Sequence, residues 1–253
     1  MNIDERKKIL TYKSKVNYYV QAWQKEFRLN LRQFQMDEQA SYSITAAHIA
    51  KKRDREILMG RHGIPQDVCI FDGMACVGGD SLSFMCNFEE SVVISNEYDM
   101  NRYNYLFYNM ELVRTQLSRY RGAQMSRLGN VLDFWNGDTD NKKIFEKCNA
   151  LYLDPEWGGV GYQYTKEISL SINDHPLDEC VLDAFNASKK LHWVILKLPC
   201  NYDKNQIMRI IAKLKLFANS YKFVVHNKEK MVFVVLERAD KYVNEIIQET
   251  ILM

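Results

Sequence analysis

The chain has 253 residues and a mass of 29.8 kDa, with 34 basic and 32 acidic side chains and a formal net charge of +2. About 250 residues are enough for one large domain with a full hydrophobic core, so folding needs neither a disulfide nor a metal. No run of about 18 apolar residues exists, and the composition excludes collagen, low-complexity disorder and a membrane span. The near-neutral total hides an uneven distribution. Residues 1–65 hold 13 basic and 7 acidic side chains, a net +6, and residues 66–253 hold 21 and 25, a net −4.

The spacing of the cysteines and histidines gives no sign of a metal site. Neither Cys-x-x-Cys nor His-x-x-x-His occurs among the six cysteines and five histidines, and structural zinc sites use such spacings. Cysteines in apolar segments behave as small core residues, and the first residues lack an apolar signal region. We therefore expect a reduced, intracellular, monomeric protein with no metal and no membrane partner, in the nucleus or the cytoplasm.

Residues 5–34 contain neither Pro nor Gly, and their aromatic side chains recur at helical spacing among Lys and Arg, which predicts one or two amphipathic helices. A further helix is predicted from about Thr45, with Ser43 or Thr45 as its N-cap, to Gly60 or Gly63. We expect the aromatic stripe to pack on the main domain. The alternative is that part of it contacts a nucleic-acid base or the cap at an RNA 5′ end. The basic face suits either phosphate contact or a solvated surface. The stripe consists of Tyr12, Tyr19, Trp23, Phe27 and Phe34.

Beyond Pro65, short apolar segments alternate with segments of helical pattern. This alternation predicts parallel βα units, and two further strands that flank residues 227–230 predict an antiparallel hairpin. We expect an α/β fold with a mostly parallel, seven-stranded sheet in residues 64–253, and a helical extension in residues 1–63. The predicted strands are 68–71, 91–95, 124–128, 150–153, 192–198, 221–226 and 231–237; one predicted helix ends near 87 and the others span 100–117, 177–188 and 204–216.

Ligands of such sheets bind outside the carboxyl ends of the strands, and two of the predicted strands end in acids. Asp72 is followed by a turn that includes Gly78 and Gly79, where small residues let a ligand approach the backbone; the turn is neither a P-loop nor a nicotinamide fingerprint. Glu97 ends the next strand, at the place where an acid accepts from both ribose hydroxyls. The alternatives are an ordinary strand-to-helix turn at Asp72, and an exposed Glu97 beside a helix capped by Asp99.

The predicted strand 150–153 runs directly into Asp154-Pro155-Glu156-Trp157, followed by two glycines. A large aromatic ring beside flexible backbone is expected to stack on something, and a planar base is the natural candidate. The Asp154 carboxylate can accept hydrogen bonds from an exocyclic amine and thereby orient its lone pair. The alternative is that Trp157 packs beneath the loop.

These residues resemble a known family. Residues 150–159, Ala-Leu-Tyr-Leu-Asp-Pro-Glu-Trp-Gly-Gly, are similar to the amine-methylating loop, Asp/Asn/Ser-Pro-Pro-Trp/Tyr, of class I, Rossmann-like S-adenosylmethionine-dependent methyltransferases. Over residues 18–237 the chain resembles the trimethylguanosine synthases, which are cap guanine-N2 methyltransferases. Asp72-Gly-Met-Ala-Cys-Val-Gly-Gly-Asp resembles their Asp-Ala-Phe-Cys-Gly-Val-Gly-Gly-Asn turn, Tyr42-Ser-Ile-Thr their Trp-Phe-Ser-Val-Thr-Pro entry, and Leu198-Pro-Cys-Asn their Leu-Pro-Arg-Asn.

The resemblance implies S-adenosylmethionine as the cofactor and a capped RNA or cap nucleotide as the partner. Asp72 and the Gly78–Gly79 turn would hold the methionine part of the cofactor, and Glu97 would bind its ribose. The other implied roles place Asn130 near adenine, Ser43 and Thr45 on the cofactor side, Trp157 against the cationic 7-methylguanine, Asp154 and Pro155 around the amine, and Glu156, Lys197 and Asn201 on the substrate side.

The implied reaction is methyl transfer to the exocyclic N2 of a 7-methylguanosine RNA cap, with Asp154 orienting the amine and Trp157 holding the ring plane. Some positions depart from the family pattern: Cys76 replaces a glycine, Glu156 the second proline, and Cys200 an arginine expected to bind the cap phosphates. Two alternatives therefore stay open. One is methylation of another RNA or DNA base amine, such as guanine N2 of rRNA or tRNA or adenine N6. The other is a catalytically relict methyltransferase fold that binds RNA or serves as a scaffold.

Overall fold

The structure is a computed structural model that describes residues 19, 21–137, 139–214, 217–225 and 228–238. The chain divides into two compact units, Met1–Asp133 and Phe134–Met253, which we call unit 1 and unit 2. Within the described ranges, no helix is both long and apolar enough to cross a membrane.

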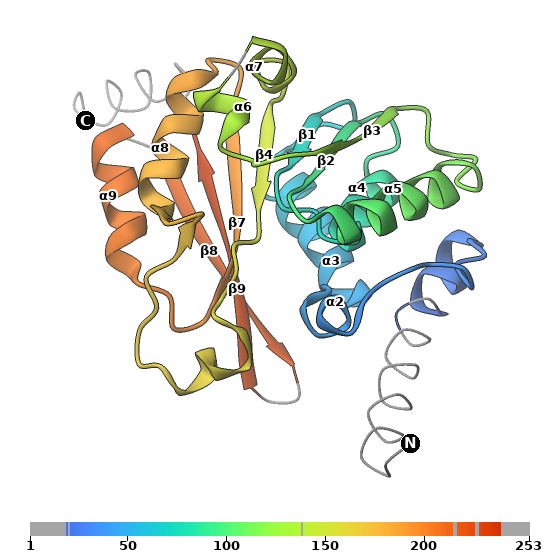
Figure 1. Ribbon diagram of the computed structural model, residues 1–253, viewed down its shortest axis with the longest axis horizontal. Coiled ribbons are helices and arrows are strands. Elements are labelled where there is room, and N and C mark those ends of the chain that lie inside the picture. Colours follow the sequence, from blue (N-terminus) through green and yellow to red (C-terminus); the bar gives the residue numbers. More distant parts are fainter. Residues whose placement is uncertain (1–18, 20, 138, 215–216, 226–227, 239–253) are drawn as a thin grey trace, which may run out of the picture. The chain divides into compact units, whose positions relative to one another are not determined.

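Unit 1 contains three parallel strands in the order β3-β2-β1 (Figure 1). Strand β1 (Cys69–Asp72) pairs with β2 (Val92–Glu97), which pairs with β3 (Ala123–Leu128). Helix α4 (Gly79–Asn87) connects the first two strands, and α5 (Met100–Arg114) connects the second to the third. Because β1 and β2 are parallel, their carboxyl ends lie at the same edge of the sheet. The polar residues Asp72 and Glu97 are at these ends, as predicted.

The N-terminal part of unit 1 is helical, but its helices are shorter than predicted. Residues 21–27 are helical, and Arg28 then adopts a left-handed φ of 57°, which ends the helix before Phe34. Three short helices follow: α2 (Glu38–Ser43), α3 (Ala47–Lys52) and the π-helical turn η1 (Arg53–Met59). The prediction of a helix that ends near Gly60 is confirmed.

The prediction that Ser43 or Thr45 caps that helix is wrong. The N-cap of α3 is Ala46, with no side-chain cap. Ser43 belongs to the preceding helix, α2, which Asp37 caps. The Thr45 hydroxyl donates instead to Asp80, a residue of α4 that lies far away in the sequence. A local capping rule cannot anticipate such a distant partner.

The aromatic stripe packs inside unit 1. Trp23 is fully buried, and Tyr19 and Phe34 are 4% and 5% exposed. The rings of Trp23 and Phe27 have their centroids 5.6 Å apart. Packing, rather than base contact, is therefore the role of these four aromatic residues; Tyr12 lies outside the described residues.

Unit 2 contains four strands in the order β4-β7-β9-β8. Strands β4 (Ala150–Leu153) and β7 (Trp193–Pro199) are parallel, whereas β9 (Lys228–Glu237) is antiparallel to both β7 and β8 (Phe217–Val225). Helices α8 (Leu177–Ala187) and α9 (Lys204–Leu214) lie side by side in the orange part of the ribbon (Figure 1). The remaining elements are α6 (Asp133–Asn136), which begins at the unit boundary, α7 (Thr139–Phe145), the 3-10 helix η2 (Gly159–Tyr164), β5 (Ser171–Ile172) and β6 (His175–Pro176).

The seven predicted strands are present within the described residues, mostly parallel and with an antiparallel pair near the C-terminus, so the predicted α/β class is confirmed. The assignment of residues 1–63 and 64–253 to an extension and a main domain stays a prediction. Helices α6 and α7 and the short β5–β6 pair were not predicted, because each is too short to show a hydrophobic period.

Candidate active site

The acid at the end of β1 is a buried, hydrogen-bonded side chain. Asp72 is 1% exposed, and its Oδ2 accepts a 2.6 Å hydrogen bond from the hydroxyl of Ser81 in α4. The Ser81 Oγ also lies 2.7 Å from Oγ of Ser95 in β2. Because these three side chains connect β1, β2 and α4, they fix the turn between Asp72 and Gly79.

That turn has left-handed backbone at two positions. Gly78, the N-cap of α4, has φ +91°, and a Cβ there would lie 2.5 Å from Cε of Met110. A Cβ on Gly79 would lie 2.5 Å from Cγ1 of Ile44. The glycine pair therefore admits the protein's own side chains against α4. Cys76 has φ 52°, a conformation that costs a residue with a Cβ roughly 1–2 kcal/mol. The glycine that Cys76 replaces in the family pattern would adopt it freely.

Glu97 is a buried carboxylate held by two backbone N–H groups. It is 8% exposed; its Oε2 accepts from Cys76 N–H and its Oε1 from Asp99 N–H, both at 2.8 Å. Burial raises the pKa of Glu97, although these backbone hydrogen bonds oppose the rise. Asp99 does cap α5 by accepting from Arg102 N–H. The cap of the alternative interpretation is therefore present, but Glu97 is not exposed.

Asn96 is a residue that the sequence analysis missed. It is 1% exposed, and its Nδ2 donates to the carbonyls of Gly73 (3.1 Å) and Gly129 (3.0 Å). The backbone carbonyl of Asn96 accepts from Ala75 N–H. One amide side chain therefore holds the carboxyl ends of β1, β2 and β3 together. The available signal was a run of three polar residues, Ser95, Asn96 and Glu97, at the end of a strand that begins with three apolar residues.

The other residues assigned to the cofactor side are unequally placed. Asn130 follows the Gly129 that Asn96 holds; it is half-buried, and its Oδ1 accepts from Leu132 N–H. Ser43 is exposed, and its hydroxyl lies within 3.3 Å of the Ala40 carbonyl of its own helix. Thr45 is 1% exposed, with its hydroxyl committed to Asp80.

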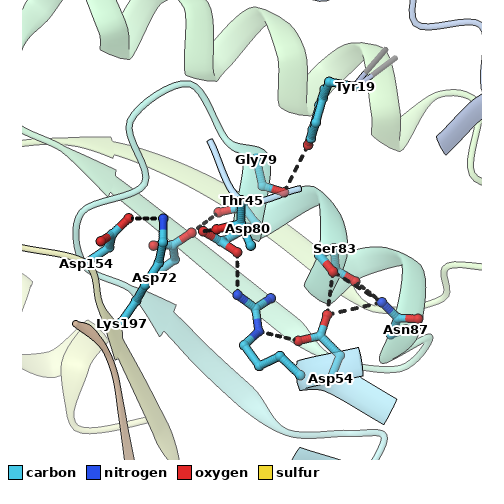
Figure 2. A network of polar contacts seen from close by, with 12 residues as sticks. Tyr19, Thr45, Asp54, Asp72, Gly79, Asp80, Ser83, Asn87, Asp154 and Lys197 are labelled. Atoms are coloured by element: carbon cyan, nitrogen blue, oxygen red, sulfur yellow. Dashed lines mark hydrogen bonds and ion pairs between the residues drawn. The ribbon is translucent and has the colours of Figure 1, made fainter. Parts of the chain in front are cut away.

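A buried ionic network lies beside the glycine turn. Figure 2 shows the carboxylates of Asp54 and Asp80 hydrogen-bonded to the same guanidinium group. Arg53 is fully buried and bridges two acids: its Nε donates to Asp54 at 2.6 Å, and its Nη1 donates to Asp80. Asp80 also accepts from Thr45 at 2.9 Å. Tyr19 adds a hydrogen bond to the Gly79 carbonyl. The N-terminal helices are thus connected to the first turn of α4 by buried polar contacts.

In unit 2, the segment that follows β4 changes from buried to exposed within four residues. Pro155 is buried, Asp154 and Trp157 are half-buried, and Glu156 is exposed. Gly158 and Gly159 follow with φ +87° and +70°. These two successive left-handed residues turn the chain sharply into η2. Only glycine adopts this backbone conformation without strain.

Trp157 contacts an aromatic ring and a cation. The ring of Tyr162 lies 5.2 Å from the indole at an interplanar angle of 75°, an edge-to-face contact. The Lys197 ammonium lies over the indole, 5.6 Å from the ring centroid. The indole N–H is buried and has no hydrogen-bond partner within the described part of the chain. Trp157 is therefore partly packed, as the alternative interpretation held, and partly accessible.

Lys197 of β7 and Asn201, which follows this strand, support the segment after β4. Lys197 is 2% exposed, and its Nζ donates to Oδ2 of Asp154 at 2.6 Å (Figure 2). Asn201 donates from Nδ2 to the carbonyls of Tyr162 (2.9 Å) and Thr165 (2.6 Å). Both therefore bind the protein's own loop. Cys200 is half-buried, and a cysteine side chain offers no cation at this position.

Among the described residues, no group of three or more His, Cys, Asp or Glu side chains is arranged to hold a metal ion. The six cysteines form no disulfide. Burial and the nearby Glu97 raise the pKa of Cys76 to about 12, so its thiol stays protonated at neutral pH.

Comparison with known families gives the chain a place. Residues 68–245, more than half of the chain, match the family described as RNA cap guanine-N2 methyltransferase. The chain belongs to this family. The match begins beside β1 and includes both Asp72 and the Asp154–Trp157 segment, so the resemblance seen in the sequence is confirmed.

Similar proteins show the same fold. The N-terminal domain of human METTL16 matches 90% of this chain and 82% of its own, with a TM-score of 0.57 and 12% identity. The human methyltransferase 10 domain containing protein matches 89% of this chain and 97% of its own, with a TM-score of 0.55 and 11% identity. At these identities the likeness shows the fold, which is that of the Rossmann-like class I methyltransferases.

A curated relative is protein L320 of Acanthamoeba polyphaga mimivirus, which is 28% identical over 165 residues. These residues are 65% of this chain and 56% of the relative. The chain thus spans about half the length of that relative.

Proposed function

We propose that this methyltransferase transfers a methyl group from S-adenosylmethionine to the exocyclic N2 of 7-methylguanosine at an RNA 5′ end. The observation that carries the proposal is the family match, because it includes the segment Asp154-Pro155-Glu156-Trp157 directly after β4. One structure of the human METTL16 N-terminal domain is a complex with SAH, the demethylated form of the same cofactor.

Unit 1 fits a nucleoside cofactor. Glu97 keeps acceptor capacity beyond the two N–H groups it binds, since a carboxylate has about four lone-pair sites. We assign these sites to the ribose hydroxyls. Asp72, Gly78 and Gly79 would bind the methionine part, and Asn130 would lie near adenine. Ser43 and Thr45 would support this half from the N-terminal helices, Thr45 through its hydrogen bond to Asp80.

Unit 2 would bind the acceptor. The cofactor supplies an already activated methyl group, so the protein's task is mainly to align the acceptor amine. Asp154 and Pro155 would shape the amine site, with Asp154 accepting an amine N–H, while Trp157 would hold the plane of the base. A cationic 7-methylguanine gains from stacking on indole, and the exposed Glu156 adds a negative charge beside it. Asn201 would act by holding the loop that carries Tyr162.

A second class of acceptor is favoured by two observations. Cys200 stands where the family pattern has arginine, and the Lys197 ammonium is buried against Asp154. Neither residue offers a cation to the cap phosphates. Methylation of guanine N2 or adenine N6 in another nucleic acid does not require a cation that binds the cap phosphates. The same loop would bind these amines.

The test is methyl transfer from labelled S-adenosylmethionine to 7-methyl-GTP, with GTP and an adenine-containing oligonucleotide as competing acceptors. We expect 7-methyl-GTP to be labelled in preference to GTP. Equal labelling of the two, or preferential labelling of adenine, would overturn the cap assignment. Calorimetry with SAH is the parallel measurement, and absence of binding would indicate a relict fold.

Trp157→Ala and Trp157→Phe provide the matched variants for this assay. We expect Trp157→Ala to abolish transfer and to leave SAH affinity within about threefold of wild type, because the indole belongs to the acceptor side. Trp157→Phe keeps a ring and should retain part of the activity, since stacking on phenylalanine is weaker than on tryptophan. Loss of SAH affinity together with activity would instead make Trp157 a structural residue.

A further inference from the structure

Lys197 is a buried lysine next to residues Asp154–Trp157, which we call the acceptor segment. Burying an ammonium group is costly unless it is paired, and the other lysines of unit 2 whose side chains are described are all exposed. Lys197 is 2% exposed. A single buried lysine in a strand that ends at the site calls for a specific partner. The exposed lysines are Lys142, Lys143, Lys147, Lys166, Lys189, Lys190, Lys204 and Lys213.

The strand register supplies that partner. Leu153 of β4 lies opposite Leu196 of β7 in a parallel pair. Asp154 and Lys197 are the next residues after this pair, so their side chains meet, with 2.6 Å between Lys197 Nζ and Asp154 Oδ2. The same ammonium lies over the Trp157 indole. One buried cation therefore contacts both the acid and the ring of the acceptor segment.

We propose that Lys197 is a positioning residue for methyl transfer: its ammonium holds the Asp154 carboxylate and the Trp157 indole in the orientation that receives the acceptor amine. The proposal rests on the proposed function of the segment as the amine site. The Lys197 ammonium donates to Oδ2 of Asp154 and thereby fixes the rotation of the carboxylate. This rotation directs Oδ1 toward the acceptor amine. Its charge also balances Asp154, so Asp154 acts as a hydrogen-bond acceptor rather than as a source of net negative charge.

This role differs from a contact with the cap phosphates. A lysine that grips a phosphate needs its ammonium at the surface, whereas that of Lys197 is covered and already paired. The net negative charge of the acceptor segment then comes from exposed Glu156. Lys197 should accordingly affect the rate of transfer more than the binding of the nucleotide.

The experiment compares wild type with Lys197→Met, Lys197→Arg and Lys190→Met, using whichever acceptor the wild type methylates. We expect Lys197→Met to lower kcat by about 10- to 100-fold, because small misplacement of reacting groups costs up to about 100-fold. The acceptor KM and SAH affinity should change less than about threefold. Lys197→Arg keeps a cation and should recover at least about a tenth of the wild-type kcat, and the exposed-site control Lys190→Met should match wild type.

The outcomes are separable. A Lys197→Met variant with the kcat of Lys190→Met, or a loss that appears in KM alone, would overturn the positioning role while the proposed function stands. A wild type that binds SAH but methylates no nucleotide would overturn the proposed function and the positioning role with it. If Lys197→Met does not fold, the double variant Lys197→Met/Asp154→Asn takes its place, because it removes both charges of the Lys197–Asp154 pair. Retention of wild-type kcat in this double variant contradicts the proposal.

Discussion

The backbone N–H of Cys76 donates a 2.8 Å hydrogen bond to Oε2 of Glu97 and thereby joins the turn after β1 to the end of β2. In this turn Cys76 takes a left-handed φ of 52°. The same carboxylate accepts from Asp99 N–H at the start of α5. Glu97 is thus both a proposed ribose ligand and a structural connection between two turns, and its protonation state affects both.

We expect the affinity for SAH to fall as pH decreases. Burial raises the pKa of Glu97 above its ordinary value of 4.5, and ribose hydroxyls donate to the ionised carboxylate. Binding is therefore strongest above this raised pKa and weakens as pH falls through it. Calorimetry between pH 7.5 and 5 measures the trend. Glu97→Gln should bind about tenfold or more weakly at pH 7.5, since a hydrogen bond to a charged group contributes about 1.5–3 kcal/mol, and its affinity should be flat over this range. An equally steep decline in Glu97→Gln would assign the titration to another group.

Cys76→Gly and Cys76→Ala separate backbone strain from loss of the thiol. Both remove the sulfur, but only glycine adopts φ 52° without cost. We expect Cys76→Gly to be more stable than Cys76→Ala by about 1 kcal/mol in the free energy of unfolding, because alanine at positive φ loses more than it gains by stiffening the unfolded chain. Urea denaturation measures the difference, and equal stabilities of the two variants would show that the turn relaxes to a negative φ when alanine replaces Cys76.

Arg53→Met tests the buried ionic network. The substitution leaves Asp54 and Asp80 buried without the cation that bridges them, and loss of one partner of a buried ion pair costs about 3–5 kcal/mol. We expect a loss of this size in urea denaturation, together with weaker SAH binding, because Asp80 lies directly after the glycine turn. Arg121→Met is the control: Arg121 pairs with Glu90 at an exposed site, and its removal should not change stability measurably. Similar behaviour of the two variants would rule out a structural role for the network.

The strands and the longer helices followed from the sequence because short apolar segments alternate with segments of helical pattern beyond Pro65. The positions of Asp72, Glu97 and Asp154 at strand ends followed for the same reason. Pairings across long sequence distances did not. Asp154 and Lys197 are 43 residues apart and meet only through the register of β4 and β7.

The role of side chains that bind backbone was also beyond prediction. Asn96 and Asn201 both use their amide groups on carbonyls of neighbouring loops, whereas the family pattern offered Asn201 only as a substrate residue. Likewise, the space beside Gly79 is filled by Ile44, which no local rule connects to that turn. Such contacts depend on how the loops pack, and sequence periodicity carries no information about it.

Asn201→Ala should loosen the loop that carries Tyr162. The change removes the donor to the carbonyls of Tyr162 and Thr165, and the Tyr162 ring packs edge-to-face on Trp157. We expect the acceptor KM to rise about tenfold, which corresponds to about 1.4 kcal/mol and to the loss of one or two hydrogen bonds. SAH affinity should be unchanged, because the loop belongs to unit 2. Asn186→Ala, an exposed change in α8, is the control. Limited proteolysis should cut Asn201→Ala faster within residues 159–165, and an unaltered KM in a variant cleaved this way would separate the loop from acceptor binding.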